Sequence, residues 1–531
     1  MNNNFPKGSE WRKWDLQVQT ILDDGYVSIG SYIEEIKTSS PDKLTQLVTA
    51  IGSEELVIKY DSKEYFTNST NGTEKLRAEN YAKLFVNFIE IFNEDVGGIC
   101  ITDHNYDHPQ LVDALVKESK STKLSVLPGV EINVEGVHLL VVFGKYAYNK
   151  TSFSETIKTF LTKLDIHSRK KDGVLTVCSK SYQEVIDEVT KIEGIIIYPH
   201  CNSTNGLFQE RGKTDRTHLQ DYFNYQKVNV LQSKTSSSNN QTEQYIKSKT
   251  EFKSGHVFTL GSDSRCLRDI LQPDSEGNYC WIKADTTFLG LKQIIYEKER
   301  VFVGVKPNVI ERVSSAKTKY IQSLSVNQIE GYGEEQGIWF KETEIPLNSE
   351  LVAIIGNKGS GKSAIADIIG LLGDTKQSEH FSFLNEDKFL RRGYAENFTA
   401  QLHWEDELES ENVSLANQVD PTRVERVRYL PQNYFETITN SLNSDNFEKS
   451  LRAVIFQNIP EPDKLGLSSF EDLEKTQKKN IEHDLERLKS ELSQIIEKIV
   501  ALEKKQHPDF INKLKNSITE KEKEVAYNFS V

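Results

Sequence analysis

A glycine-rich loop between a predicted strand and a predicted helix constrains the fold of this chain more than any other feature. Residues 356–363 read Gly-Asn-Lys-Gly-Ser-Gly-Lys-Ser, after an apolar run at 350–355 and before a predicted helix at 364–372. This matches the pattern G-x-x-x-x-G-K-[ST], whose backbone N–H groups surround phosphate oxygens at a helix N-terminus. Lys362 would reach the β- and γ-phosphates of a nucleotide, and the Ser363 hydroxyl would coordinate Mg²⁺. We therefore expect ATP and Mg²⁺ to bind at Gly356, Asn357, Gly359, Ser360, Gly361, Lys362, Ser363 and Ala364.

A second segment of the same region resembles part of an ABC- or SMC-type ATPase head. Residues 427–432 read Val-Arg-Tyr-Leu-Pro-Gln, similar to the strand and glutamine that open the Q-loop of those heads. The resemblance implies that Gln432 approaches Mg²⁺ and senses the γ-phosphate, so Lys362 and Gln432 are the expected catalytic residues. The alternative is an ordinary glutamine at the end of a strand.

Two further motifs of such a head do not occur in the sequence. It contains no S-G-G-like signature run and no apolar strand that ends in Asp-Glu. In SMC-like proteins both lie beyond a returning coiled coil. Either the chain is a fragment or another chain supplies the second half of the head, and we expect ATP hydrolysis to need that half.

Short apolar runs alternate with helix-like stretches over residues 1 to 310. The runs are bounded by glycine and polar residues, are rich in β-branched side chains, and lie at 97–102, 138–143, 194–198, 228–232 and 257–260. Such runs indicate buried parallel strands. Their alternation with helices predicts an α/β barrel or a doubly wound sheet.

The C-terminal region has a different periodicity. Apolar residues repeat at spacings of 4 and 3, which predicts a coiled-coil seam; the alternative is an amphipathic helix packed on a globular core. Pro508 is expected to break the helix, and a second helix begins after it. The seam consists of Ile481, Leu485, Leu488, Leu492, Ile495, Ile499 and Leu502.

The overall composition argues against a membrane-spanning protein and against a simple DNA-coating protein. No apolar run approaches the roughly 20 residues that a membrane-spanning helix needs. The formal net charge of -14 gives no general attraction to nucleic acid, but it does not exclude a local basic groove. Five cysteines without a C-x-x-C pair fit a reducing compartment, so we expect a cytoplasmic location.

Residues of the types that ligate metals stand where predicted strands of the first region begin or end. Carboxylates and imidazoles at the carboxyl ends of barrel strands converge on one pocket. Mixed nitrogen and oxygen ligands suit Zn²⁺, Mn²⁺ or Fe, and such ions can activate water and stabilise charge on a phosphoryl group. The candidate ligands are Asp103, His104, Glu131, His138, His200 and Asp263.

These residues carry a resemblance to the PHP (polymerase and histidinol phosphatase) domain, in the T-D-H motif at 102–104 and the G-x-E motif at 129–131. The resemblance implies a distorted (β/α)7 barrel with a trinuclear metal site for phosphoester hydrolysis. Fusion of such a barrel to an SMC-type head, with characteristic segments at 11–15 and 380–385, resembles the TrlF-like family, which is often associated with anti-phage defence. The domains we expect are a PHP-like barrel at 1–310, the N-terminal half of an ATPase head at 311–470 and a coiled coil at 471–531.

Three expected ligands of the PHP pattern are replaced in this chain. The opening H-x-H reads Gln17 and Gln19, which share one face of a strand, and the closing D-x-H places Arg265 after Asp263. A glutamine oxygen is a poor substitute for an imidazole nitrogen, and a guanidinium repels a cation. The six ligands that remain leave room for one or two ions.

Two functions stay open at this point. The first is an ATP-gated metal-dependent phosphoesterase that cuts DNA or RNA in anti-phage defence, as a homo-oligomer or with a partner subunit. The second is an ATPase whose barrel is catalytically degenerate and serves as a regulatory or partner-binding module. The retained ligands favour the first function and the replaced ligands favour the second. Substitutions introduced to inactivate the site would leave the same pattern.

Overall fold

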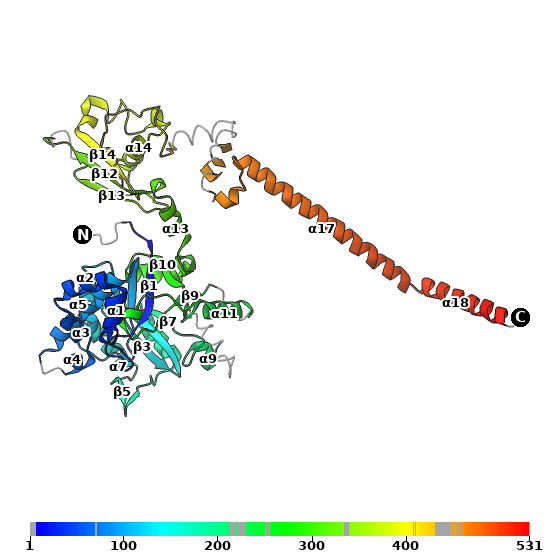
Figure 1. The fold of residues 1–531 in the computed structure, drawn as a ribbon, viewed down its shortest axis with the longest axis horizontal. Helices are drawn as coiled ribbons and strands as arrows, with labels where there is room; N and C mark the ends of the chain where they lie inside the picture. The colour runs from blue at the N-terminus through cyan, green and yellow to red at the C-terminus, as the bar shows by residue number, and fades with distance from the viewer. Residues whose placement is uncertain are drawn as a thin grey trace. The chain divides into compact units, whose positions relative to one another are not determined.

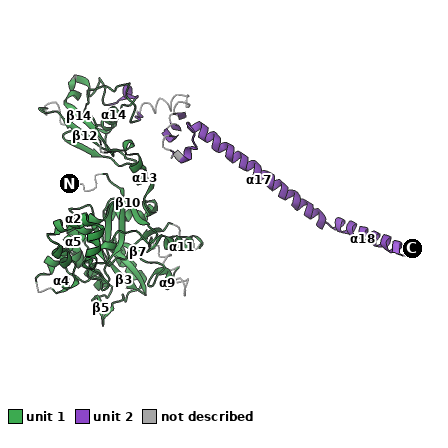
Figure 2. Cartoon of the chain, viewed as in Figure 1, with its two compact units in different colours: residues 1–375, 383–427 green, residues 376–382, 428–531 purple. Residues whose placement is uncertain are grey.

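The structure is a computed structural model that describes residues 7–68, 72–211, 219, 229–249, 252, 255–333, 339–406, 408, 410–430, 448–449, 451–452, 454–456, 459 and 461–529. The chain forms two compact units (Figure 2). The first comprises Met1–Thr375 and Phe383–Val427, and the second comprises Lys376–Ser382 and Arg428–Val531.

A nine-stranded sheet, counted over the described residues, carries the candidate metal ligands. Its strand order is β11-β10-β1-β2-β3-β4-β7-β8-β9. A bridge between Val18, at the end of β1, and Ser264, shortly after β9, nearly closes the sheet into a barrel. The strands are β1 Glu10–Val18, β2 Val96–Ile101, β3 Ser125–Val134, β4 Val137–Val142, β7 Ile195–Tyr198, β8 Val230–Ser233, β9 Val257–Leu260, β10 Tyr279–Ala284 and β11 Val301–Gly304.

This sheet confirms the predicted α/β barrel in outline, but its strands do not all run in parallel. β1, β2 and β3 pair in parallel, as do β7, β8 and β9. The run at 138–143 was expected to be a parallel strand, and this prediction is wrong, because β4 is antiparallel to both β3 and β7. Only Glu135 and Gly136 connect β3 to β4, with φ of 52° and 88°, the two-residue turn that reverses a chain into a hairpin.

Helices cover the sheet, and α1 to α5 gather on one side of it (Figure 1). The longest of them, α5, buries Leu84, Phe85 and Ile89 completely in the core of the barrel. A capping box of Ser181 and Glu184 begins α8. The helices are α1 Ile33–Ser39, α2 Pro41–Ile51, α3 Glu54–Tyr60, α4 Lys63–Thr67, α5 Glu74–Phe92, α6 Leu111–Ser119, α7 Phe153–Lys163, α8 Tyr182–Lys191, α9 Leu207–Arg211, α11 Ser236–Lys247, α12 Phe288–Lys292 and α13 Asn308–Ser315.

A separate four-stranded sheet and helix α14 form the part of the first unit that contains the glycine loop. The sheet has the order β13-β12-β14-β15 and is antiparallel throughout. Alternate residues of β14 are buried, and this strand contacts α14. α14 agrees with the predicted helix at 364–372. The elements are β12 Ile321–Gln328, β13 Thr343–Pro346, α14 Lys362–Leu372, β14 Phe398–Trp404 and β15 Val413–Ser414.

The strand predicted at 350–355 is not formed. In the described part of the chain, the four strands near α14 pair only with one another, and residues 351–355 have no strand partner. Leu351 and Ile355 are 95% and 90% exposed. A strand needs a neighbour that takes its backbone N–H and C=O groups, so an apolar run is not sufficient by itself.

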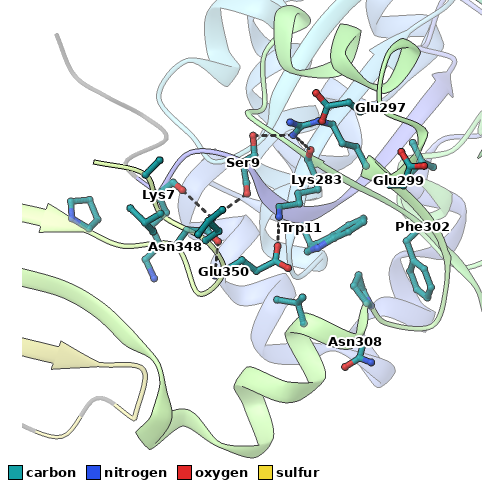
Figure 3. Close-up of a pocket in the computed structure, with 18 residues that line it drawn as sticks. Lys7, Ser9, Trp11, Lys283, Glu297, Glu299, Phe302, Asn308, Asn348 and Glu350 are labelled. Atoms are coloured by element: carbon teal, nitrogen blue, oxygen red, sulfur yellow. Dashed lines mark hydrogen bonds and ion pairs between the residues drawn. The ribbon is translucent and has the colours of Figure 1, made fainter. Parts of the chain in front are cut away.

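The segment before the glycine loop contacts the barrel strands instead (Figure 3). Nδ2 of Asn348 donates to the carbonyl oxygens of Lys7 and Ser9, at 3.0 and 3.1 Å. Glu350 forms an ion pair with Lys283 of β10. These residues line a cavity of about 860 Å³. The chain is thus attached to the residues just before β1 and to β10, a few residues before the loop begins.

The second unit contains two long helices, α17 (Phe470–Gln506) and α18 (Pro508–Phe529). The predicted break at Pro508 is confirmed, because α17 ends just before it and α18 begins at it. The seven seam residues of α17 are each 49% to 59% exposed, so the seam lacks a partner within the described residues. Among the helices that the structure describes, none has the length and apolar character to cross a membrane.

Candidate metal centre

Glu131, a buried carboxylate on β3, is surrounded by three histidine side chains. Nδ1 of His138 lies 2.6 Å from Oε1 of Glu131. Nε2 of His104 and Nε2 of His200 lie 3.4 and 3.5 Å from the same oxygen. The ring of His138 makes edge-to-face contacts with both other rings, at centroid distances of 5.5 and 5.3 Å. The structure therefore brings these four predicted ligands together.

Neighbouring strands deliver these side chains to one place. His138 lies on β4 in the hairpin that pairs it with Asn133, two residues after Glu131. His104 follows β2, and its backbone bridges to Glu131. His200 follows β7 with φ of +33°, a region that residues other than glycine rarely enter. The site thus forms where β2 and β7 end beside the β3–β4 hairpin.

One set of ligand atoms in this cluster has the spacing of a metal site. Atoms of His104, Glu131 and His138 all lie within 4.8 Å of one another. Ligands of a tetrahedral Zn²⁺, bound at 2.0–2.1 Å, lie about 3.3 Å apart. The 3.4 Å between Nε2 of His104 and Oε1 of Glu131 is close to this value, while the 2.6 Å contact of His138 would lengthen on binding. These residues fit one ion with two imidazole ligands and one carboxylate ligand.

The carboxylates and imidazoles of the cluster shift one another's pKa values. Burial disfavours the charged form of Glu131, but hydrogen bonds with the three histidines outweigh it and hold its pKa well below the ordinary value. Burial also disfavours a charged His104, yet Asp23 and Glu131 raise its pKa to about 10. Burial disfavours the charged form of Asp23, but its partners, foremost the hydrogen bond with His104, together outweigh burial and hold the pKa of Asp23 well below its ordinary range. A metal ion at His104 would compete with protons for the imidazole, so metal affinity would depend on pH.

Gln17 and Gln19 present N–H groups where the PHP pattern has imidazoles. Nε2 of Gln17 and Nε2 of Gln19 donate to Oε2 of Glu131, at 3.1 and 2.9 Å. Nε2 of Gln17 also donates to Oδ1 of Asp263 at 3.4 Å. Nε2 of Gln232 donates to Oε1 of Gln17 at 2.8 Å, and this contact sets the orientation of the Gln17 amide.

Asp103 is buried, and each of its oxygens accepts one hydrogen bond from Thr20. The backbone N–H and the hydroxyl of Thr20 donate to these oxygens at 2.7 and 2.8 Å. Burial raises the pKa of Asp103 to about 6. These hydrogen bonds attach the chain that leaves β1 to Asp103, and metal ligation by this carboxylate stays a prediction.

Asp263 is paired with cations of the protein itself. Its Oδ2 lies 3.0 Å from Nη1 of Arg265 and 3.0 Å from Nζ of Lys234. Nε of Arg265 donates to Oδ1 of Asp23 at 2.9 Å, so the guanidinium contacts two carboxylates. Nδ1 of His104 lies 3.1 Å from Oδ2 of Asp23. Sequence analysis missed Asp23, because it follows β1 outside any motif, and its only signal was its position four residues after Gln19.

The glycine loop encloses the ammonium group of its own lysine. Nζ of Lys362 donates to the carbonyl oxygens of Gly356 and Asn357, at 2.8 Å in both cases. Ser363 is exposed in the first turn of α14, and Ala364 is buried. The residues expected to bind phosphate and Mg²⁺ are therefore close in space, with Lys362 turned back onto the loop.

The glycines of this loop have two different roles. Gly359 and Gly361 have φ of 87° and 90°, a conformation that only glycine adopts without strain. A Cβ on Gly356 would lie 2.4 Å from Oγ of Ser360, so this position needs glycine for space. The predicted catalytic residue Gln432 lies outside the residues that the structure describes.

Comparison with solved structures finds distant similarities. No family profile matches this chain, and no curated protein matches it. A solved two-domain protein from Bacteroides vulgatus, described as containing a predicted PHP-like metal-dependent phosphoesterase, is 10% identical with a TM-score of 0.31, over 62% of this chain and 75% of that one. Endonuclease Q in complex with a 27-mer duplex is 11% identical with a TM-score of 0.30, over 44% of this chain and about half (54%) of that one. The ATPase head and the TrlF-like resemblance remain predictions.

Proposed function

We propose that this chain is a metal-dependent phosphoesterase that cleaves nucleic acid and is controlled by ATP bound at the glycine loop. The observation that carries the proposal is the group of three imidazoles around the buried carboxylate of Glu131. Glu131 is 1% exposed, and burying a charge is unfavourable unless partners compensate for the lost water. An arrangement of imidazoles and one carboxylate suits a catalytic transition metal better than it suits packing.

Zn²⁺ or Mn²⁺ would be held by His104, Glu131 and His138. When bound, such an ion supplies activation of water and polarisation of a phosphoryl oxygen. The low pKa of Glu131 keeps it ionised and ready to ligate. On the other side of the site, Arg265 and Lys234 are 31% and 52% exposed, so their remaining N–H groups can receive phosphate oxygens of a substrate.

ATP would bind at the glycine loop with Mg²⁺ on Ser363. Lys362 would leave the carbonyls of Gly356 and Asn357 and turn to the β- and γ-phosphates, while Gln432 would sense the γ-phosphate. Hydrolysis of ATP would require the second half of an SMC-type head, supplied by a partner chain. The domain division at 310 and 470 belongs to the same proposal.

The partners and the setting are part of the same proposal. A net charge of -14 confines contact with DNA or RNA to a local surface such as the one at Arg265 and Lys234. The seam of α17 would join a partner subunit or a second copy. We place this protein in the cytoplasm and in anti-phage defence.

A second function, a regulatory or partner-binding barrel without catalysis, is favoured by one observation. Arg265 and Lys234 already neutralise Asp263, which the PHP resemblance assigns to a metal ion. Under this alternative the barrel would bind its nucleic acid or protein partner and leave it intact.

A nuclease assay separates these two functions. The full chain is incubated with single- and double-stranded DNA and RNA in Mn²⁺, with and without ATP. The phosphoesterase proposal predicts cleavage that His138→Ala abolishes and that His167→Ala, a change at an exposed histidine of the same barrel, leaves intact. Binding of nucleic acid without cleavage by the unaltered chain would favour the regulatory function.

A further inference from the structure

We infer that N–H groups of Gln17, Arg265 and Lys234 occupy the places of further metal ions, so that this site is built for one ion and a fixed protein cation. The inference rests on the proposed function, because it concerns the same site. It names the residues that set the number of ions.

The first place lies between Glu131 and Asp263. Nε2 of Gln17 donates to Oε2 of Glu131 at 3.1 Å and to Oδ1 of Asp263 at 3.4 Å, so one amide group joins two carboxylates. Gln232 fixes the orientation of the Gln17 amide, because Nε2 of Gln232 donates to Oε1 of Gln17 at 2.8 Å. The amide oxygen of Gln17 is therefore occupied, and its nitrogen faces the carboxylates.

The second place lies between Asp23 and Asp263. The guanidinium of Arg265 contacts Oδ1 of Asp23 through Nε at 2.9 Å and Oδ2 of Asp263 through Nη1 at 3.0 Å. Lys234 adds a second positive charge at 3.0 Å from Asp263. Gly25 leaves room for this arrangement, because a Cβ there would lie 2.9 Å from Cδ of Arg265.

Charge balance explains why a second ion is excluded. Asp23 and Asp263 are 6% and 10% exposed and need positive partners, which a divalent ion or the two side-chain cations can supply. Arg265 and Lys234 together carry the charge of one divalent ion. A second ion beside them would meet two like charges at close range, and the electrostatic repulsion would outweigh its attraction to the carboxylates.

The test measures bound metal in full-length variants after equilibration with Mn²⁺ and removal of free ion. The double variant Arg265→Gln with Lys234→Gln should bind one more Mn²⁺ per chain than the unaltered protein. A matched control, Arg268→Gln with Lys247→Gln, removes two surface cations that pair with Glu35 and Glu243, and it should change nothing. Arg265→Lys, which keeps the charge, should also gain no ion.

The inference is tested by the difference in bound Mn²⁺ between the double variant and the unaltered chain. The proposed function is tested by the number of ions that the unaltered chain binds. No gain in the double variant, with circular dichroism showing it folded, overturns the inference, as does an equal gain in the control. If the double variant does not fold, Arg265→Gln alone is compared with Arg265→Lys: a gain of bound ion is expected in the first and none in the second, and no gain in Arg265→Gln overturns the inference. If the unaltered chain binds no ion, the metal site at Glu131 is wrong, and the gain of bound Mn²⁺ in the double variant can still be measured.

Discussion

Nε2 of Gln232 donates a hydrogen bond to Oε1 of Gln17 at 2.8 Å and so connects β8 with β1 inside the barrel. Both side chains are buried, with 0% and 1% exposure. The contact depends on Gly261, because a Cβ at that position would lie 2.0 Å from Nε2 of Gln232. Three positions that are far apart in the sequence thus determine how the amide of Gln17 faces Glu131.

Gly261→Ala should displace the Gln232 amide and destabilise the barrel. The lost hydrogen bond leaves buried polar groups without partners, so the free energy of unfolding should fall by about 1–3 kcal/mol. Urea unfolding followed by tryptophan fluorescence measures this change. Gly333→Ala is the control, since a Cβ there meets nothing within 4 Å. Equal stability of the two variants would show that Gly261 is not needed for space.

Lys362→Ala should weaken ATP binding at least tenfold, about 1.4 kcal/mol, because it removes the cation expected at the β- and γ-phosphates. Titration calorimetry with ATP and Mg²⁺ measures the affinity. Lys358→Ala is the matched control, a second lysine of the same loop whose side chain is exposed. Unchanged affinity in the Lys362 variant would remove the nucleotide site from this account.

Asp61 should make the stability of the barrel depend on pH. Burial raises its pKa to about 7, with partial compensation by hydrogen bonds from Tyr26 and from the backbone N–H of Ile29. Between about pH 4 and pH 7 the unfolded chain has lost this proton while the folded chain keeps it. Stability should therefore fall as pH rises through this window and level off above it.

Asp61→Asn should remove that part of the pH dependence. The variant should gain stability relative to the unaltered chain by at most about 1.4 kcal/mol per pH unit between pH 5 and pH 7. Urea unfolding at pH 5, 6, 7 and 8 provides the comparison. Parallel stability curves for the two proteins would contradict the raised pKa.

The exposed seam of α17 should drive association. Leu488 and Ile495 are 52% and 53% exposed, so Leu488→Lys with Ile495→Lys should leave the fold of the chain unchanged and abolish assembly. Sedimentation velocity of the full chain measures the oligomeric state. Ser490→Lys, on the opposite side of the helix, should not alter it. A monomeric unaltered chain would rule out self-association through this seam.

Part of the metal site could be predicted from the sequence because it follows strand ends. His104 and His200 come three and two residues after the ends of buried apolar strands, and Glu131 and His138 lie on neighbouring apolar strands. A pattern of this kind specifies proximity, and the structure agrees. It does not specify the direction of β4, which the two-residue turn at Glu135 and Gly136 decides.

The remaining details of the site depend on partners that no local pattern encodes. Asp103 stands in a ligand motif, and the motif does not show that Thr20, 83 residues away, donates to both of its oxygens. Asp23 stands in no motif, yet it pairs with His104 and Arg265. The apolar run at 350–355 likewise lacks the neighbouring strand that its composition leads one to expect. Each of these outcomes depends on contacts between residues far apart in the chain.

The metal content of the purified full-length chain tests the central claim most directly. Inductively coupled plasma mass spectrometry after equilibration with Zn²⁺ or Mn²⁺ should find about one ion per chain, because only His104, Glu131 and His138 combine suitable ligands at metal-site spacing among the described residues. His138→Ala should lose that ion, and His167→Ala should keep it. Three ions in the unaltered chain, or one ion that His138→Ala retains, would contradict the site described here.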